Sequence, residues 1–324
     1  MSTTHLTHRI RFMVAAVSAA ALSLFMLPAV SAQGTMTQTA TSTHRDTRTW
    51  HVQVGEETAH QAIQGMAFLP GTVWINAGDR ITWTANAGEI HTVTFLAKGQ
   101  PLKPFDPFDP KQLRPRGGSH YDGESYYNSG IMSNAEAPLF PAWRTYTLTF
   151  DETGTFTYWC LVHGTMMKGV VHVRPAGTDY PFSQEQYDRR SARHAHRIFA
   201  DGLRLWVATA LQARNRTSYL GADDGVAMVM RFIRPVARIH VGQTVTWRNV
   251  GMAAPHTVTF GPERANIFAP YGDPSHFSGG QLNSGIVEPG GSFTVRFTKA
   301  GTYPYICALH DNLGMMGKVI VTGE

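Results

Sequence analysis

The sequence is poor in cysteine and carries little net charge. Only two cysteines, Cys160 and Cys307, occur among 324 residues, and the net charge is +5. In an oxidising compartment, two cysteines allow at most one disulfide within the chain. No run of basic residues is interleaved with aromatics in the way that a nucleic-acid surface requires. We therefore expect no nucleic-acid partner.

An apolar run of nearly membrane-spanning length lies at the N-terminus. It extends from Phe12 to about Val30, follows two arginines and ends in small residues. This order predicts a secretory signal peptide over residues 1–32, cut before Gln33, and hence a periplasmic or extracellular protein. An uncleaved membrane anchor is the alternative. The small residues and Pro28 favour cleavage, after which we expect no stable membrane insertion.

The rest of the chain repeats itself. In residues 73–95, V-W-I-N-A-G-D-R-I-T-W is followed by H-T-V-T-F, and residues 237–260 read A-R-I-H-V-G-Q-T-V-T-W, again followed by H-T-V-T-F. The segment T-Y-T-L-T-F-D-E-T-G-T-F-T-Y-W-C-L-V-H recurs as S-F-T-V-R-F-T-K-A-G-T-Y-P-Y-I-C-A-L-H. Short alternating runs of β-branched and aromatic residues, separated by turn residues, predict an antiparallel β-sandwich or barrel in each copy. We expect an all-β protein with domains at 49–175 and 222–324, and Trp83 and Trp247 in their cores.

The segment between the copies, residues 176–221, differs in character. Ser183 and Gln186 form a capping-box pattern, and the residues that follow are rich in Ala, Arg, Gln and Leu. This pattern predicts a helix from Gln184 to Ala213, although Gly202 argues against one uninterrupted helix. The face predicted to pack against a domain contains Ile198, Leu203, Trp206, Val207 and Leu211. Residues 33–48, before the first copy, are expected to be flexible.

Each copy contains the same set of candidate metal ligands. One histidine heads the H-T-V-T-F segment, and the other three ligands follow the motif C-x2-H-x3-M in the first copy and C-x2-H-x4-M in the second. The eight residues are His91, Cys160, His163, Met167, His256, Cys307, His310 and Met315. Two imidazoles and a thiolate in a plane, with a distant axial thioether, form a blue, type 1 copper site. The sequence therefore predicts two type 1 copper ions per chain.

Each copper loop contains a pair of methionines. The framing M-x-G selects Met167 and Met315 as the axial ligands and leaves Met166 and Met316 to loop packing. The loop is one residue shorter in the first copy. This difference predicts that the two sites have different reduction potentials.

At these residues the sequence resembles plastocyanin, azurin and their bacterial relatives, the cupredoxin family. The resemblance is carried by A-F-L-P-G-T-V-W-I-N-A-G-D-R-I-T-W and by Y-I-C-A-L-H-D-N-L-G-M-M-G-K-V, and it covers about residues 50–175 and 226–324. It implies two Greek-key β-sandwich domains and single-electron transfer between redox protein partners. It also implies that electrons pass through an apolar surface near the second histidine of each set. Insertions at 97–142 and 261–290 depart from the family pattern, and they either cover this surface or shape a specific partner site.

Two rival functions use similar ligands. A multicopper oxidase or copper nitrite reductase needs extra histidines, in H-x-H pairs on strands and directly after the cysteine. Leu161 and Ala308 follow the cysteines here, and the H-x-H pair His194–His196 falls in the expected helix.

Two other histidines, His120 and His276, recur in both copies and leave a further metal site open.

A copper storage or delivery protein would have a more open ligand set. We therefore predict an electron carrier rather than an enzyme, whose two sites either exchange electrons or serve different partners.

Overall fold

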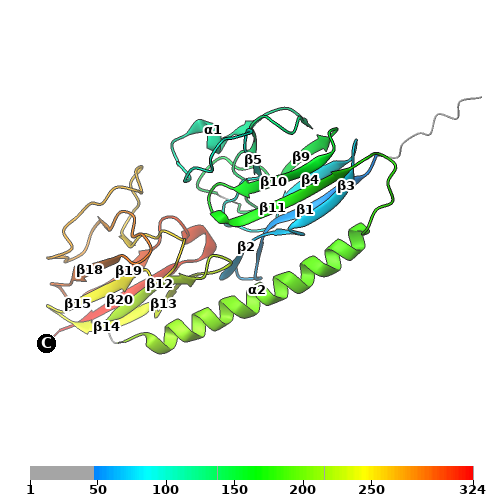
Figure 1. Ribbon diagram of the computed structural model, residues 1–324. Helices are drawn as coiled ribbons and strands as arrows, with labels where there is room; N and C mark the ends of the chain where they lie inside the picture. The colour runs from blue at the N-terminus through cyan, green and yellow to red at the C-terminus, as the bar shows by residue number, and fades with distance from the viewer. Residues whose placement is uncertain (1–46, 137, 215, 324) are drawn as a thin grey trace, which may run out of the picture. The chain divides into compact units, whose positions relative to one another are not determined.

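The computed structural model describes residues 47–136, 138–214 and 216–323. The predicted signal peptide and nearly all of the predicted flexible segment lie outside the described residues. The described residues form one compact unit, in which short strands are combined with one long helix (Figure 1). In the described part of the chain, no helix is long and apolar enough to cross a membrane.

Two sheets enclose the core of the first domain. The strands of one sheet are, in spatial order, β2 (Ile63–Leu69), β1 (Thr49–Glu57), β4 (Arg80–Ala85), β9 (Thr145–Phe150) and β7 (His120–Tyr121). Those of the other are β3 (Thr72–Asn76), β11 (Gly164–Arg174), β10 (Gly154–Cys160), β5 (Thr94–Phe95), β8 (Tyr127–Ser129) and β6 (Pro115–Arg116). Alternate residues of β1, beginning with Trp50 and Val52, point into the core. The insertion between β5 and β9 contains a short helix, α1 (Pro110–Leu113).

The second domain repeats this arrangement. One sheet contains β18 (Ser292–Arg296), β15 (Thr244–Arg248), β12 (Thr217–Asp223) and β13 (Ala227–Ile233). The other contains β14 (Val236–His240), β20 (Met316–Thr322), β19 (Gly301–Ile306), β16 (Thr259–Phe260) and β17 (Leu282–Asn283). A 3-10 helix, η1 (Asp311–Leu313), lies in the loop before β20. Trp83 and Trp247 are fully buried in the two cores, as predicted. The all-β prediction with two sandwich domains is confirmed.

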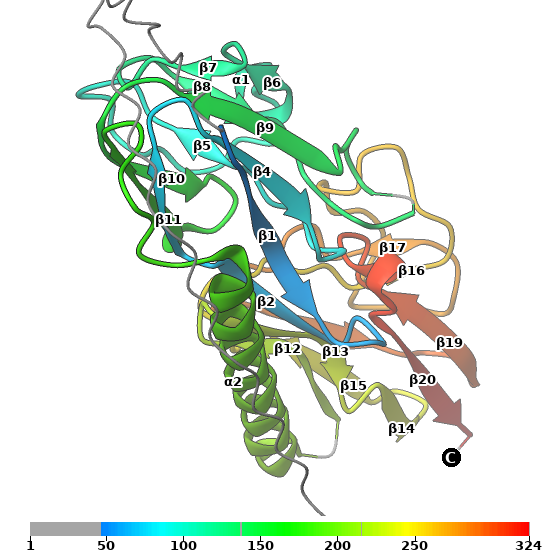
Figure 2. The same cartoon turned by 90° about the vertical axis from the view of Figure 1, so that its right-hand side faces the viewer.

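One sheet runs through both domains (Figure 2). Strands β2 and β13 pair in antiparallel fashion, with Gln64 opposite Met228 and Gly65 opposite Ala227. This pairing joins two smaller sheets into a nine-stranded sheet that extends from β18 to β7. The backbone hydrogen bonds of a β-ladder therefore fix the register between the two domains.

The connecting helix α2 (Gln184–Gln212) is continuous and begins with the predicted capping box at Ser183. It lies along both domains (Figures 1 and 2) and packs on β2 and β13. Its buried residues are Tyr187, Ser191, Ala195, Ile198, Gly202 and Thr209.

The predicted packing face of this helix is wrong in part, because Leu203, Val207 and Leu211 are exposed. Small residues face the sheet instead and allow a close approach. A Cβ atom on Gly202 would lie 2.4 Å from Cγ2 of Ile63.

Candidate metal centres

The first candidate centre brings together His91, Cys160 and His163. Cys160 ends β10, His163 lies in the turn before β11, and His91 forms an isolated bridge with Met132 just before β5. The Cys160 Sγ atom lies 3.2 Å from Nδ1 of His163 and 3.8 Å from Nδ1 of His91. All three side chains are buried. A thiol and two imidazole nitrogens from three segments thus converge on one point inside the sandwich.

The second candidate centre has the same construction. Cys307 directly follows β19, and His310 precedes η1 in the same loop. The Cys307 Sγ atom lies 3.4 Å from Nδ1 of His310 and 3.7 Å from Nδ1 of His256. In each centre the three ligand atoms lie within 4.8 Å of one another. Both cysteines are free, so the alternative of a single disulfide between them is wrong for this structure.

The paired methionines differ sharply in exposure. Met167 is 1% exposed and Met315 is fully buried, whereas Met166 is 40% and Met316 is 57% exposed. Met167 and Met315 belong to the hydrophobic cores that also contain Cys160 and Cys307, respectively. The structure thus places inside each core the methionine that the M-x-G framing selects.

Burial sets the protonation of the candidate ligands. It raises the pKa of the Cys160 and Cys307 thiols to about 11. It lowers the pKa of His163 to about 3, helped by the neighbouring charge of His310, and that of His310 to about 4. At neutral pH the histidines therefore hold free lone pairs, and metal binding must displace a proton from each thiol.

A backbone amide points at each sulfur. The N–H of Thr92 donates to Cys160 Sγ at 3.4 Å, and that of Thr257 donates to Cys307 Sγ at 3.3 Å. The Thr92 hydroxyl accepts from the Leu161 N–H at 2.8 Å. Hydrogen bonds to a ligand sulfur stabilise a thiolate and tune the potential of the metal that it binds.

A polar chain ties each insertion to the strand that follows the first histidine. In the first domain, Thr94 donates its hydroxyl to Asn128, whose amide donates to the carbonyls of Lys111 and Gln112. In the second, Thr259 donates to Asn283 at 3.2 Å, and Asn283 donates to the carbonyl of Ile267. These asparagines were not predicted as part of the sites. The signal that could have identified them is the segment N-S-G, which contains each of them and occurs in both copies.

Two glycines that sequence analysis missed lie against the first histidine of each set. Gly55 has φ +73°, and a Cβ atom there would lie 2.5 Å from Nε2 of His91. Gly221 has φ +67°, and its Cβ atom would lie 2.4 Å from the Val229 carbonyl and 3.4 Å from His256 Nε2. Each glycine sits where the ladder register shifts, in β1 and β12 respectively. A bulge with a left-handed glycine makes room for the imidazole.

The second histidines of the two centres, His163 and His310, line one cavity of about 260 Å³. Both insertions contribute apolar walls to it, including Phe105 and Phe140 from the first and Phe268 from the second. Each of the two histidines is only 6% exposed. The insertions thus help to cover the metal-side surface, which is one of the two roles predicted for them.

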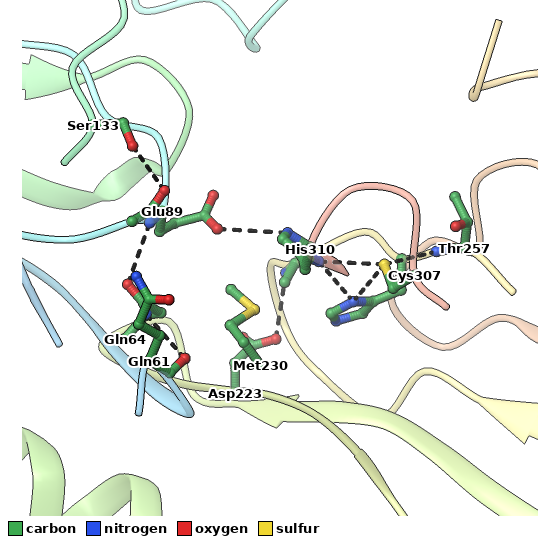
Figure 3. A network of polar contacts seen from close by, with 12 residues as sticks. Gln61, Gln64, Glu89, Ser133, Asp223, Met230, Thr257, Cys307 and His310 are labelled. Carbon is green, nitrogen blue, oxygen red and sulfur yellow. Dashed lines mark hydrogen bonds and ion pairs between the residues drawn. The ribbon is translucent and has the colours of Figure 1, made fainter. Parts of the chain in front are cut away.

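A carboxyl group of the first domain reaches the second centre (Figure 3). Glu89 Oε2 lies 3.5 Å from Nε2 of His310. Burial raises the pKa of Glu89 to about 7.

The two recurring histidines, His120 and His276, lie elsewhere. His120 Nδ1 contacts Asp151 at 2.6 Å, and His276 Nδ1 lies 3.6 Å from Asp273, both at the surface. Among the described residues, neither joins a cluster of three candidate metal ligands. The open possibility of a further metal there gains no support.

Comparisons with known proteins agree with this construction. The family model for copper binding proteins of the plastocyanin/azurin family matches residues 55–174 and 219–322. Plastocyanin of Tetradesmus obliquus is 36% identical over 35% of this chain and 70% of its own length. Plastocyanin of Scenedesmus fuscus is 35% identical over 32% of this chain and 97% of its own length.

Among solved structures, a Cu(I) form of an amicyanin mutant is 27% identical, with a TM-score of 0.24, over 33% of this chain and 80% of its own length. The two family matches fall on the two halves that hold the candidate centres. This chain therefore belongs to the plastocyanin/azurin family of copper binding proteins, the blue copper cupredoxins, and contains two such domains.

Proposed function

We propose that each domain binds one type 1 copper ion and that the protein carries single electrons between redox protein partners. The observation that carries the proposal is the repetition of a buried Cys–His–His cluster in two family-matched domains. We assign His91, Cys160, His163 and Met167 to one ion and His256, Cys307, His310 and Met315 to the other. Domain limits of 49–175 and 222–324, with a linker at 176–221, are part of the proposal.

The residues suit copper better than other common metals. A set of one thiol, two imidazoles and one thioether is soft, and it matches the ligands of a blue-copper site. Zinc sites have four-coordinate sets of Cys, His and carboxylate without a thioether. Copper bound in this way supplies a one-electron Cu(II)/Cu(I) couple.

The chain itself supplies rigidity. The candidate ligands are buried at strand ends and in the loops beside them, and the amides of Thr92 and Thr257 already point at the sulfurs. Because cores are close-packed, such groups have little freedom to rearrange. Little ligand motion is needed when the charge at the site changes, which favours rapid electron exchange.

The shared cavity bears on the choice between exchange and separate partners. His163 and His310 line one cavity, and this proximity supports exchange between the two sites. We propose internal exchange rather than service to different partners. We also propose that the shorter Met167 loop gives the two sites different potentials, and that the protein acts in the periplasm or outside the cell.

A redox titration of the copper-loaded protein tests the function. We expect two one-electron steps, and each of Cys160→Ser and Cys307→Ser should remove one of them. Paramagnetic resonance should show only the narrow copper hyperfine splitting of type 1 sites. A third copper with a wide splitting would contradict the electron carrier and favour a copper enzyme.

A further inference from the structure

The second candidate centre lies against a charged group from the other domain. Glu89 is only 7% exposed, and its carboxyl oxygen faces Nε2 of His310 at 3.5 Å. Among the described residues, His310 is the only basic side chain in ion-pair contact with Glu89. A buried carboxylate is costly unless a polar partner compensates it. Besides the backbone N–H of Ile90, the Nε2 edge of His310 is the polar partner that the fold provides.

The backbone at and just before Glu89 is held in place (Figure 3). Its N–H donates to the Gln64 side chain at 3.3 Å. The carbonyl of the preceding Gly88 accepts from the Ser133 hydroxyl at 2.9 Å. The Gly88 N–H donates to the Glu57 carboxylate at 2.8 Å. The carboxyl group is therefore presented from a fixed segment rather than from a mobile loop.

The same residues fix the domain interface. Gln64, which holds the Glu89 backbone, is also the ladder partner of Met228 in β13. Leu313, three residues after His310, packs in the core of the first domain, where a Cβ atom on Gly88 would lie 2.5 Å from its Cδ2. The contact between Glu89 and His310 is thus a product of the inter-domain register.

The two centres are not equivalent in this respect. Glu89 stands two residues before His91 in the first copy, and Ala254 stands two residues before His256 in the second. Among the described residues, no acidic side chain forms an ion pair with His163, the counterpart of His310. Only one of the two repeats supplies a carboxyl group to its neighbour's histidine.

We propose that Glu89 is a positioning residue for the copper site of the other domain, holding His310 with its proton on Nε2 and its Nδ1 free for the metal. This inference rests on the proposed function. An outer carboxylate orients a ligating histidine, fixes its tautomer and raises its basicity, and loss of such a group typically weakens metal binding. Glu89 therefore stabilises Cu(II) at the second site and lowers the reduction potential of that site alone.

The test uses the full chain carrying Cys160→Ser, in which only the second site can be blue. Glu89→Gln keeps the shape of the side chain and removes its charge. We expect about a tenfold loss of Cu(II) affinity in competition with a chelator. We also expect the Cu(II)/Cu(I) equilibrium to move about tenfold toward Cu(I), which is about 59 mV for one electron.

Glu288→Gln is the matched control. Glu288 lines the same cavity, and among the described residues its side chain makes no ion pair with a ligand histidine. We expect less than a twofold change in either quantity for this variant. Glu89→Gln in a chain carrying Cys307→Ser should likewise leave the first site unchanged.

Equal effects of Glu89→Gln and Glu288→Gln, or equal shifts at both sites, would overturn the proposal. A merely structural role of Glu89 would lower stability without a shift confined to the second site. If the chain with Cys160→Ser alone showed no blue absorption, the proposed function would fail instead. Nitrogen NMR of the Cu(I) protein tests the wild-type chain directly. Slower exchange of the His310 Nε2 proton in the wild-type chain than in Glu89→Gln supports the proposal, and equal exchange in the two chains overturns it.

Discussion

Gly55→Ala tests how the scaffold makes room for the first histidine. At φ +73° an L-residue is strained by about 1–2 kcal/mol. The new methyl group would also lie 2.5 Å from His91 Nε2 and 2.7 Å from Ala87 Cβ. Overpacking of this kind costs about 1–3 kcal/mol. We therefore expect the free energy of unfolding to fall by about 2–5 kcal/mol. We also expect the His91 side chain to be displaced from its position in the first candidate centre.

Gly99→Ala is the control, because Gly99 has a similar φ of +77° and no atom within 4 Å of its Cβ position. Its free energy of unfolding should fall only by the cost of the strained backbone, about 1–2 kcal/mol. Urea unfolding of the copper-free variants measures the difference, and absorption after copper loading measures the site. Gly55→Ala should lose the blue absorption of the first site and keep that of the second. Equal stability and equal absorption for the two variants would refute the reasoning.

Three further predictions address the ligands and their supports. Met167→Leu should change the potential of the first site, whereas Met166→Leu should not, because only Met167 is buried; equal potentials measured by voltammetry for both variants would exclude Met167 as the axial ligand. Asn128→Ala should lower stability by about 1–3 kcal/mol, since it leaves the Thr94 hydroxyl and two carbonyls in the insertion without their partner; thermal unfolding should show a smaller loss for Asn134→Ala, a half-buried residue with one side-chain bond to Glu57. In the copper-free protein, burial holds the pKa of His163 below the value that it has in the unfolded chain. The neutral, buried imidazole therefore costs no stability at neutral pH. As the pH falls, the unfolded chain takes up a proton that the folded chain does not, and the free energy of unfolding decreases. Relative to His163→Asn, the free energy of unfolding should decrease by about 1.4 kcal/mol per pH unit between about pH 6 and about pH 4, and a difference independent of pH in urea titrations would contradict the burial of this imidazole.

The candidate ligands could be predicted from the sequence because their spacing is local. Cys160 and His163 occupy one turn between paired strands, so a short motif determines their geometry. His91 was found because the H-T-V-T-F segment recurs in the second copy. The strands were predicted for the same reason, since alternating residues such as Trp50 and Val52 mark a buried face.

The inter-domain features could not be predicted in this way. The contact of Glu89 with His310 depends on the register between β2 and β13, which no local pattern encodes. Within the first domain, the contact of Gly55 with His91 was not predicted either, because it depends on a bulge in β1 that no sequence pattern marks. The face of α2 was misjudged because apolar residues such as Leu203 point outward, while Gly202 allows the close approach to β2.

The central claim, that each domain holds a type 1 copper, is tested most directly by copper analysis and visible absorption of the loaded protein. We expect two copper ions per chain and an intense thiolate-to-copper band, half of which disappears in Cys160→Ser and the other half in Cys307→Ser. Absence of this band, with the two thiols found joined in a disulfide, would contradict it.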